Sequence, residues 1–263
     1  MNTLLVLGIA HVLGDYVLQS HSLAEKKQKP GGEGLFLHAL LYALAMASVF
    51  LCAGQSAGRA WALLSLSHWV IDAIRIRLGR RWSGPGAALL LFCTDQALHL
   101  AMIILCWLWF LRSSATPLFL VWSGHAWFRP ILLYAAMLCI LTKPSAILIR
   151  LALQALPTAK LDKPAAPTEG PPVPDESTAE PPASAASASL AVGALIGMLE
   201  RVIVAALYLS GAATAIGFVL TAKSIARFKE FESRDFTERY LVGTLLSVAL
   251  ALLTVMLFSR FLP

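Results

Sequence analysis

Three apolar segments of the sequence each contain one histidine and one aspartate that are four positions apart. The pairs are His11 with Asp15, His68 with Asp72, and Asp95 with His99. Residues at this spacing share one face of an α-helix, so both side chains of a pair project in the same direction. Imidazole and carboxylate groups bind divalent transition metals, and both serve as acids and bases in catalysis. The pattern therefore indicates metal binding or proton transfer.

A metal ion would explain why so many polar groups occur in apolar segments. A single aspartate in hydrocarbon costs at least about 2.5 kcal/mol, and a bound divalent ion offsets that cost. The predicted ligands, which include one histidine of a further apolar segment, are His11, Asp15, His38, His68, Asp72, Asp95 and His99. The three aspartates are also the candidates for a catalytic base. Mixed imidazole and carboxylate ligands favour zinc as the cofactor, with iron or manganese as alternatives.

The segments that position these residues are apolar enough to cross a membrane. Hydrophobic residues make up 58% of the 263 residues and charged residues 14%, compared with about 45–50% and about 25% in soluble domains. Long uncharged runs are typical of transmembrane helices, whereas the strands of a membrane barrel alternate apolar and polar residues. We therefore predict an all-α, polytopic helical membrane protein. A soluble enzyme and a nucleic-acid-binding domain are excluded.

Composition divides the chain into four regions. Residues 1–111 are predicted to form an N-terminal four-helix transmembrane bundle that holds the His/Asp cluster, with helices at about 3–20, 35–53, 60–77 and 87–111. Residues 112–156 contain a loop and a hydrophobic segment that is interrupted at Lys143-Pro144, and residues 157–189 form a disordered linker rich in proline and alanine. Residues 190–263 form a C-terminal pair of transmembrane helices, at about 190–222 and 240–258.

Three basic segments orient the chain, because positively charged loops stay in the cytoplasm. They are residues 21–34, 75–86 and 223–239. If residues 130–156 cross the membrane once, the third basic segment falls outside. If they enter and return at Lys143-Pro144, it stays inside and the acidic linker lies outside. We favour the second arrangement, a re-entrant segment, which requires cover by protein or water.

The same orientation places the three His/Asp pairs at a common depth. The order of the pair reverses in the segment with Asp95, and that helix runs antiparallel to the other two. In all three helices the aspartate therefore lies nearer the cytoplasm and the histidine lies deeper. At 1.5 Å per residue the side chains lie about 6 to 18 Å from the cytoplasmic helix ends. We expect them to converge on one pocket in the inner half of the membrane.

Four motifs in order resemble a known family. The runs HVLGDYVLQS, LFLHALLYAL, SHWVIDAIRIR and FCTDQALHL, within residues 4–110, resemble the bacterial membrane family DUF3307, a domain of unknown function. The C-terminal stretch from LERVIVAALYLSG onward resembles a region that often follows this domain. The resemblance implies a multi-pass protein of the bacterial inner membrane and implies no activity. His21 departs from the aromatic residue of the family pattern, so we assign it no role.

Three functions from different classes remain open at this point. The first is a metal-dependent hydrolase of a lipid or lipid-linked substrate. The second is a transporter of divalent cations or protons, and the third is a non-catalytic membrane scaffold. The net charge of +6 lies in short loops beside the apolar segments, so we expect membrane lipids as partners and no nucleic acid. The sequence does not specify the oligomeric state.

Overall fold

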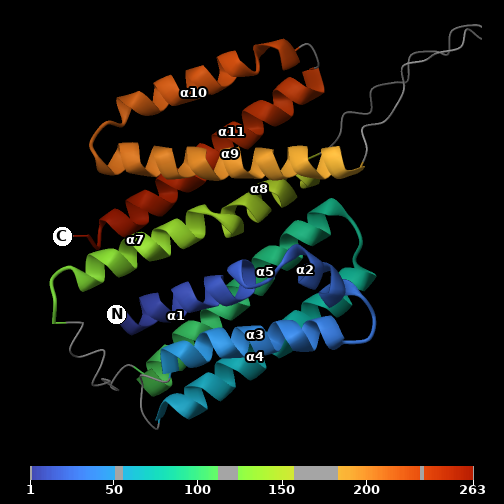
Figure 1. Ribbon diagram of the computed structural model, residues 1–263, viewed down its shortest axis with the longest axis vertical. Coiled ribbons are helices and arrows are strands. Elements are labelled where there is room, and N and C mark those ends of the chain that lie inside the picture. Colours follow the sequence, from blue (N-terminus) through green and yellow to red (C-terminus); the bar gives the residue numbers. More distant parts are fainter. Residues whose placement is uncertain (1, 51–55, 112–123, 157–182, 232–233, 263) are drawn as a thin grey trace, which may run out of the picture.

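A computed structural model describes residues 2–50, 56–111, 124–156, 183–231 and 234–262. The described residues fold into helices and include no strand, which confirms the predicted all-α class (Figure 1). The N-terminal elements are α1 (Asn2–Val12), η1 (Leu13–Val17), α2 (His21–Gln28), α3 (Glu33–Phe50), α4 (Ser56–Arg81), α5 (Pro85–Cys106) and η2 (Trp107–Leu111). The C-terminal elements are α7 (Phe128–Leu141), α8 (Lys143–Ala155), α9 (Ala183–Leu209), α10 (Thr214–Ala226), η3 (Phe228–Glu230) and α11 (Arg234–Ser259).

Each helix of the N-terminal bundle presents a buried stripe with a spacing of about four residues, as expected for one face of a helix. On α3 the stripe consists of Gly34, His38, Tyr42, Met46 and Phe50. On α4 it consists of Ala60, Leu64, His68, Asp72 and Ile76. Both stripes are polar toward one end of the bundle and apolar toward the other. The bundle interior is thus divided into a polar half and an apolar half.

Among the described residues, five helical segments are long and apolar enough to cross a membrane. They are Glu33–Phe50, Pro85–Leu111, Phe128–Ala155, Val192–Leu209 and Phe236–Ser259. A sixth arises only if the segment Asn2–Val17 is joined to α2, from which it is bent by 85°. The helix α4 does not qualify by composition, although its 26 residues are long enough. Its buried polar stripe and its arginine-rich end lower its hydropathy.

The segment around Lys143-Pro144 differs from the favoured re-entrant arrangement. Helices α7 and α8 follow one another in nearly the same direction, so residues 128–155 count as one span with a break at Thr142 (Figure 1). The proline explains the break, because it lacks a backbone N–H. Arg201 of α9 donates hydrogen bonds to the carbonyls of Leu141 (2.7 Å) and Thr142 (3.2 Å). The Ile140 carbonyl, which the missing N–H of Pro144 leaves free, accepts from the Ser145 hydroxyl at 2.6 Å. The Thr142 carbonyl also accepts from the Ala146 N–H. The carbonyls at the break are therefore satisfied while α7 and α8 continue in one direction.

The expected single helix over residues 190–222 is a helical hairpin. Helix α9 ends in a Schellman motif, in which Ala212 N–H bonds to Leu207 C=O and Gly211 N–H bonds to Tyr208 C=O. Gly211 has φ +76°, a conformation that glycine adopts without strain. Helix α10 then returns beside α9. Helix α9 also begins earlier than expected, at Ala183, because the alanine-rich residues 183–189 favour helix. Residues 157–182 of the expected linker lie outside the described residues.

The hairpin of α9 and α10 explains how the three basic segments lie at the same end of the molecule. With α7 and α8 crossing once and α9 and α10 forming a hairpin, the connections α2–α3, α4–α5 and α10–α11 all lie at one end, on the right in Figure 1. This end also holds the last residue of α8 and the first residue of α9. The three basic segments therefore share a side, as predicted, but through a hairpin after residue 190 and not through a re-entrant turn. The expected linker itself lies outside the described residues from 157 to 182, but the two helix ends that flank it lie at the end with the basic connections, which the re-entrant arrangement does not predict.

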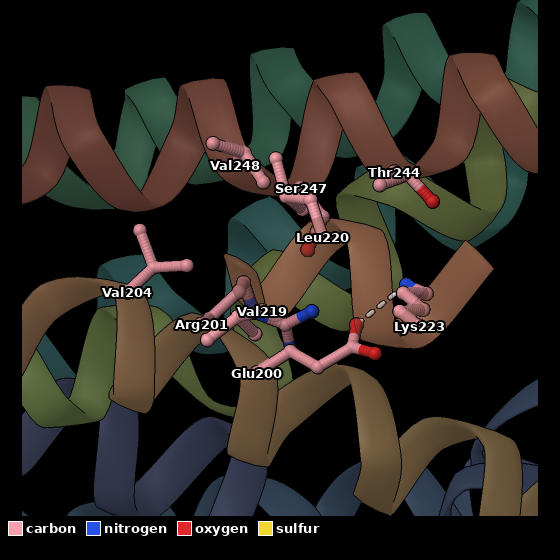
Figure 2. Close-up of a pocket in the computed structure, with 9 residues that line it drawn as sticks. All are labelled: Glu200, Arg201, Val204, Val219, Leu220, Lys223, Thr244, Ser247 and Val248. Atoms are coloured by element: carbon pink, nitrogen blue, oxygen red, sulfur yellow. Dashed lines mark hydrogen bonds and ion pairs between the residues drawn. The ribbon is translucent and has the colours of Figure 1, made fainter. Parts of the chain in front are cut away.

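The C-terminal helices pack around their own apolar core. Its buried members from α7, α9, α10 and α11 are Met137, Leu141, Val204, Ala205, Ile216, Ala251 and Val255. Beside this core lies a cavity of about 10 Å³, which has room for roughly one water molecule; Figure 2 shows the residues that line it. Lys223 of α10 donates to the Glu200 carboxylate of α9 across it at 2.5 Å. This ion pair joins the two helices of the hairpin at Glu200, the residue next to Arg201.

Candidate metal centre

The seven predicted ligands meet in the polar half of the N-terminal bundle. They come from four elements: α1 with η1, α3, α4 and α5. All seven are buried, and the rings of His38 and His68 have no exposed surface. The aspartates lie toward the end with the basic connections and the histidines of α4 and α5 lie deeper, as the reversed sequence order predicts. The structure thus confirms that the residues converge.

Four of these side chains surround one point. Their ligand atoms, one each from Asp15, His38, His68 and Asp72, all lie within 4.8 Å of one another. The Nε2 atoms of His38 and His68 are 3.0 Å apart, and Asp72 Oδ2 is 3.2 Å from the first and 3.3 Å from the second. Ligand atoms of a tetrahedral zinc ion lie about 3.3 Å apart, since each is about 2.0 Å from the metal. The spacing therefore fits one small ion.

Hydrogen bonds alone leave this group incompletely satisfied. The Nε2 atom of His38 faces His68 Nε2, Asp72 Oδ2 and also Asp15 Oδ1 at 3.2 Å. An imidazole nitrogen carries at most one hydrogen, so it satisfies at most one of these neighbours as a donor. A cation between the four groups attracts all of them at once. The chemistry of the donor set, two imidazoles and two carboxylates, suits zinc, iron or manganese.

A second group of three lies beside the first and shares Asp72 with it. One ligand atom each from Asp72, Asp95 and His99 lie within 4.8 Å of one another. His99 Nδ1 donates to the backbone carbonyl of Asp95 at 2.9 Å. With its hydrogen on Nδ1, the neutral ring has a bare lone pair on Nε2. This Nε2 and Asp95 Oδ1 are buried and have no hydrogen-bond partner among the described residues.

His11 joins the cluster but belongs to neither group. Its Nδ1 atom forms a 3.3 Å hydrogen bond with the Tyr42 hydroxyl, and its ring centroid is 5.2 Å from that of His99. Tyr42 in turn stacks on His68, with centroids 3.6 Å apart and planes inclined by 2°. These contacts position His11 and His68 relative to each other. The role of His11 as a ligand stays a prediction.

Lys27 and Arg75 belong to basic segments that are expected to be cytoplasmic loops, and the structure places both beside the aspartates of this site. The Nζ atom of Lys27 is 2.7 Å from Asp72 Oδ2, and both side chains are almost fully buried. The loop expected over residues 21–34 contains α2, which packs against α3. A Cβ atom at Gly34 of α3 would overlap the backbone of Lys26 and Lys27. The missing side chain of Gly34 therefore allows α2 to approach and to deliver Lys27 to Asp72.

Two further polar side chains border the aspartates. Gln96 Nε2 donates to Asp15 Oδ2 at 3.3 Å and to Asp95 Oδ2 at 3.0 Å. Arg75 Nε lies 4.0 Å from Asp95 Oδ2, and its side chain is 31% exposed. Helical spacing could have indicated Arg75 and Tyr42, which lie near the stripes of Asp72 and His38. Nothing in the sequence distinguishes Gln96 from a lipid-facing residue.

Beyond the histidines the bundle interior is apolar. The core there consists of Leu7, Ala10, Tyr42, Met46, Phe50, Ala60, Leu64, Ile103, Cys106 and Leu111. Except for the Tyr42 hydroxyl and the Cys106 thiol, these side chains carry no polar group, and the thiol donates to the Ala60 carbonyl. In the described part of the bundle, the polar cluster is thus continuous with one end only.

The comparisons with known proteins agree with the four sequence motifs. Residues 3–126 match the family model described as "Protein of unknown function (DUF3307)", which confirms the suspected family for this part of the chain and includes all seven cluster residues. No match was found among curated proteins or among solved structures.

Proposed function

We propose that this DUF3307 protein is a metal-dependent hydrolase that acts on a lipid or lipid-linked substrate at the membrane. The observation that carries the proposal is the set of four converging ligand atoms of Asp15, His38, His68 and Asp72. We propose zinc as the ion and the bacterial inner membrane as the location.

Three of the four side chains form the tighter subset. His38, His68 and Asp72 are 3.0–3.3 Å from one another and at most 1% exposed. Catalytic zinc sites have three protein ligands and leave the fourth position to water or substrate. We assign these three as ligands. A zinc ion there would lower the pKa of a bound water toward 7 and polarise a carbonyl or phosphoryl oxygen.

Asp15 is then the carboxylate that accepts a proton from the attacking water. Its Oδ1 atom is 3.2 Å from His38 Nε2, and Gln96 holds its other oxygen. In the proposed reaction the water oxygen bonds to the carbonyl carbon or phosphorus of an ester. The ester C–O or P–O bond breaks, and the proton held by Asp15 passes to the leaving alcohol.

The surroundings of the cluster favour an anionic, amphiphilic substrate. Lys27 and the partly exposed Arg75 place positive charge next to Asp72 and Asp95. Lipid headgroups carry phosphate at the depth of a basic helix end. The apolar core beyond the histidines argues against the transport alternative, since an ion would need polar groups across the whole bundle.

The first test is the metal content of the detergent-purified full chain. We expect bound zinc in the wild type, and its loss from this site in His68→Ala and in the milder variant His68→Gln. His125→Ala is the matched control, because His125 is exposed and stacks on Trp127 outside the cluster. Each sample must elute as a monodisperse peak. A wild type that binds no zinc, iron or manganese after reconstitution would overturn the proposal.

The second test is hydrolysis by the zinc-loaded protein in vesicles of total bacterial lipid extract, with products detected by mass spectrometry. Asp15→Asn should retain zinc and lose at least about 100-fold in rate, the usual contribution of a general base. Equal rates in Asp15→Asn and wild type would contradict the role of Asp15. Zinc entry into sealed vesicles without lipid products would instead establish transport.

A further inference from the structure

The polar cluster contains more ligand atoms than one ion can use. Four belong to the group of Asp15, His38, His68 and Asp72, and a second group of three shares Asp72 with it. The rings of His68 and His99, one from each group, have centroids only 4.4 Å apart. The two groups are therefore neighbours around one carboxylate and not separate sites.

We infer that the cluster holds two divalent ions, the second bound by Asp95 and His99 and bridged to the first by Asp72. The inference deepens the proposed function and rests on it, because the first ion is the one assigned above. Two-metal sites have ions about 3.5–4 Å apart and typically share a carboxylate. Asp72 has two carboxylate oxygens. It contacts His38 and His68 of the first group, and one of its oxygens lies within 4.8 Å of ligand atoms of Asp95 and His99.

The hydrogen-bond pattern of His99 supports a ligand role. Its Nδ1–H donates to the Asp95 carbonyl, which fixes the ring and leaves Nε2 as an acceptor. Histidines that bind metals use this arrangement, in which the other ring nitrogen donates to a backbone carbonyl or carboxylate. His99 is 3% exposed, and its bare Nε2 is buried and has no hydrogen-bond partner among the described residues. A buried acceptor in this state lacks a positive partner, which a metal ion would supply.

Asp95 shows the same incomplete pairing. Its Oδ2 accepts from Gln96 at 3.0 Å, and Arg75 lies 4.0 Å away. Its Oδ1 lies 3.8 Å from His99 Nδ1, is buried, and accepts no hydrogen bond from the described residues. Gln96 thus orients the carboxylate through one oxygen and leaves the other for a ligand. Together His99, Asp95 and Asp72, each with a ligand atom within 4.8 Å of the others, supply one imidazole and two carboxylates, a donor set for zinc or manganese.

A two-ion centre also narrows the substrate class. Paired ions stabilise both the attacking and the leaving oxygen of an in-line displacement at phosphorus. The neighbouring cations Lys27 and Arg75 suit the same charge. The substrate class that fits the centre is therefore a lipid or lipid-linked phosphoester, in preference to a carboxylic ester.

The experiment counts ions per chain by mass spectrometry of the full-length protein saturated with zinc and then dialysed. We expect two equivalents in the wild type, one in His99→Gln and in Asp95→Asn, one in His68→Gln, and none in Asp72→Ala. His125→Ala should keep two. The substitutions His99→Gln and Asp95→Asn preserve polar groups of similar size, so folding is checked by elution profile and helix content.

Manganese-loaded protein gives a second readout that does not depend on counting. Two bridged Mn²⁺ ions should produce an exchange-coupled electron paramagnetic resonance spectrum, and His99→Gln should convert it to that of an isolated ion. One equivalent in the wild type, or two in His99→Gln, would overturn the second ion and leave the proposed function intact. A wild type without metal would overturn both.

Discussion

At the scale of single residues, the contact between Lys27 and Asp72 makes the Lys27 ammonium group a competitor of the metal ion for the same carboxylate. The ammonium group is 2.7 Å from the same Asp72 oxygen that faces His38 and His68. Without metal, Lys27 compensates the buried carboxylate. When a metal ion is bound, the Lys27 ammonium group lies next to it and the two positive charges repel each other. At an effective dielectric of 20, two unit charges 4 Å apart interact by about 4 kcal/mol.

Lys27→Met should therefore bind zinc more tightly and unfold more easily without it. We expect the Kd for zinc to fall at least about tenfold, which requires only about 1.4 kcal/mol. The metal-free variant should lose about 3–5 kcal/mol of stability, the usual cost of breaking a buried ion pair. Chelator competition measures the first quantity, and thermal unfolding with and without zinc measures the second.

Lys26→Met is the matched control for this prediction. Lys26 precedes Lys27 on α2 and is exposed, so its loss removes the same charge from the chain without touching Asp72. Weaker zinc binding in Lys27→Met than in Lys26→Met would show that Lys27 supports the metal site and does not compete with it.

The histidines and aspartates could be identified from the sequence, whereas their polar neighbours could not. A charged residue in an apolar helix is conspicuous, and spacing by four residues fixes its face. Lys27 follows Lys26 in a polar segment, and only the packing of α2 against Gly34 directs one of the two inward. Gln96 lies next to Asp95, and its orientation depends on the contact between α1 and α5.

At the scale of elements, Arg201 connects the C-terminal helices to the rest of the molecule. It is 3% exposed and caps the end of α7 through two backbone carbonyls. One residue later, Lys143 Nζ donates to the Tyr16 carbonyl at 2.8 Å, next to Asp15. A continuous path of hydrogen bonds and backbone thus links α9, the break before α8, and η1.

Arg201→Met should lower the apparent melting temperature in detergent more than Arg150→Met does. The change removes the donor to the buried Leu141 carbonyl, which costs about 1–3 kcal/mol, whereas the Thr142 carbonyl keeps its bond from the Ala146 N–H. Arg150 is an exposed arginine of α8, so its loss removes equal charge at little cost. Equal melting temperatures for the two variants would mean that the Leu141 carbonyl finds another donor.

Helix boundaries were predicted well where the apolar pattern was uniform and poorly where two helices share one apolar run. Helix α11 contains the predicted segment 240–258, and α3 agrees with 35–53 as far as it is described. The run 190–222 is apolar throughout, so composition did not reveal the turn at Gly211. Pro144 indicated the break at Thr142, but the hydrogen bonds that satisfy the carbonyls there, from Ser145 and from the distant Arg201, depend on the packed structure.

At the scale of the whole molecule, the hairpin of α9 and α10 makes a prediction about sidedness. Single cysteines at Ser83 and Lys229, in a chain without its native cysteines, should react with a membrane-impermeant maleimide from one side. Cysteines at Gly124 and Ala213 should react from the other side, because the first precedes α7 and the second lies between α9 and α10, and these helix ends lie opposite the basic connections. Labelling in right-side-out and inverted vesicles measures both. Lys229 and Gly124 reacting from the same side would contradict the hairpin.

The apolar half of the bundle has a consequence for any molecule that reaches the cluster. Side chains such as Met46, Leu64 and Ile103 fill the interior beyond the histidines, so the polar cluster is separated from that end of the bundle. We expect ion, water and substrate to enter and leave from the other end, next to the basic connections. The products of a reaction there would remain in the leaflet that supplied the substrate, so the protein could change the composition of one face of the membrane without exchanging material with the other.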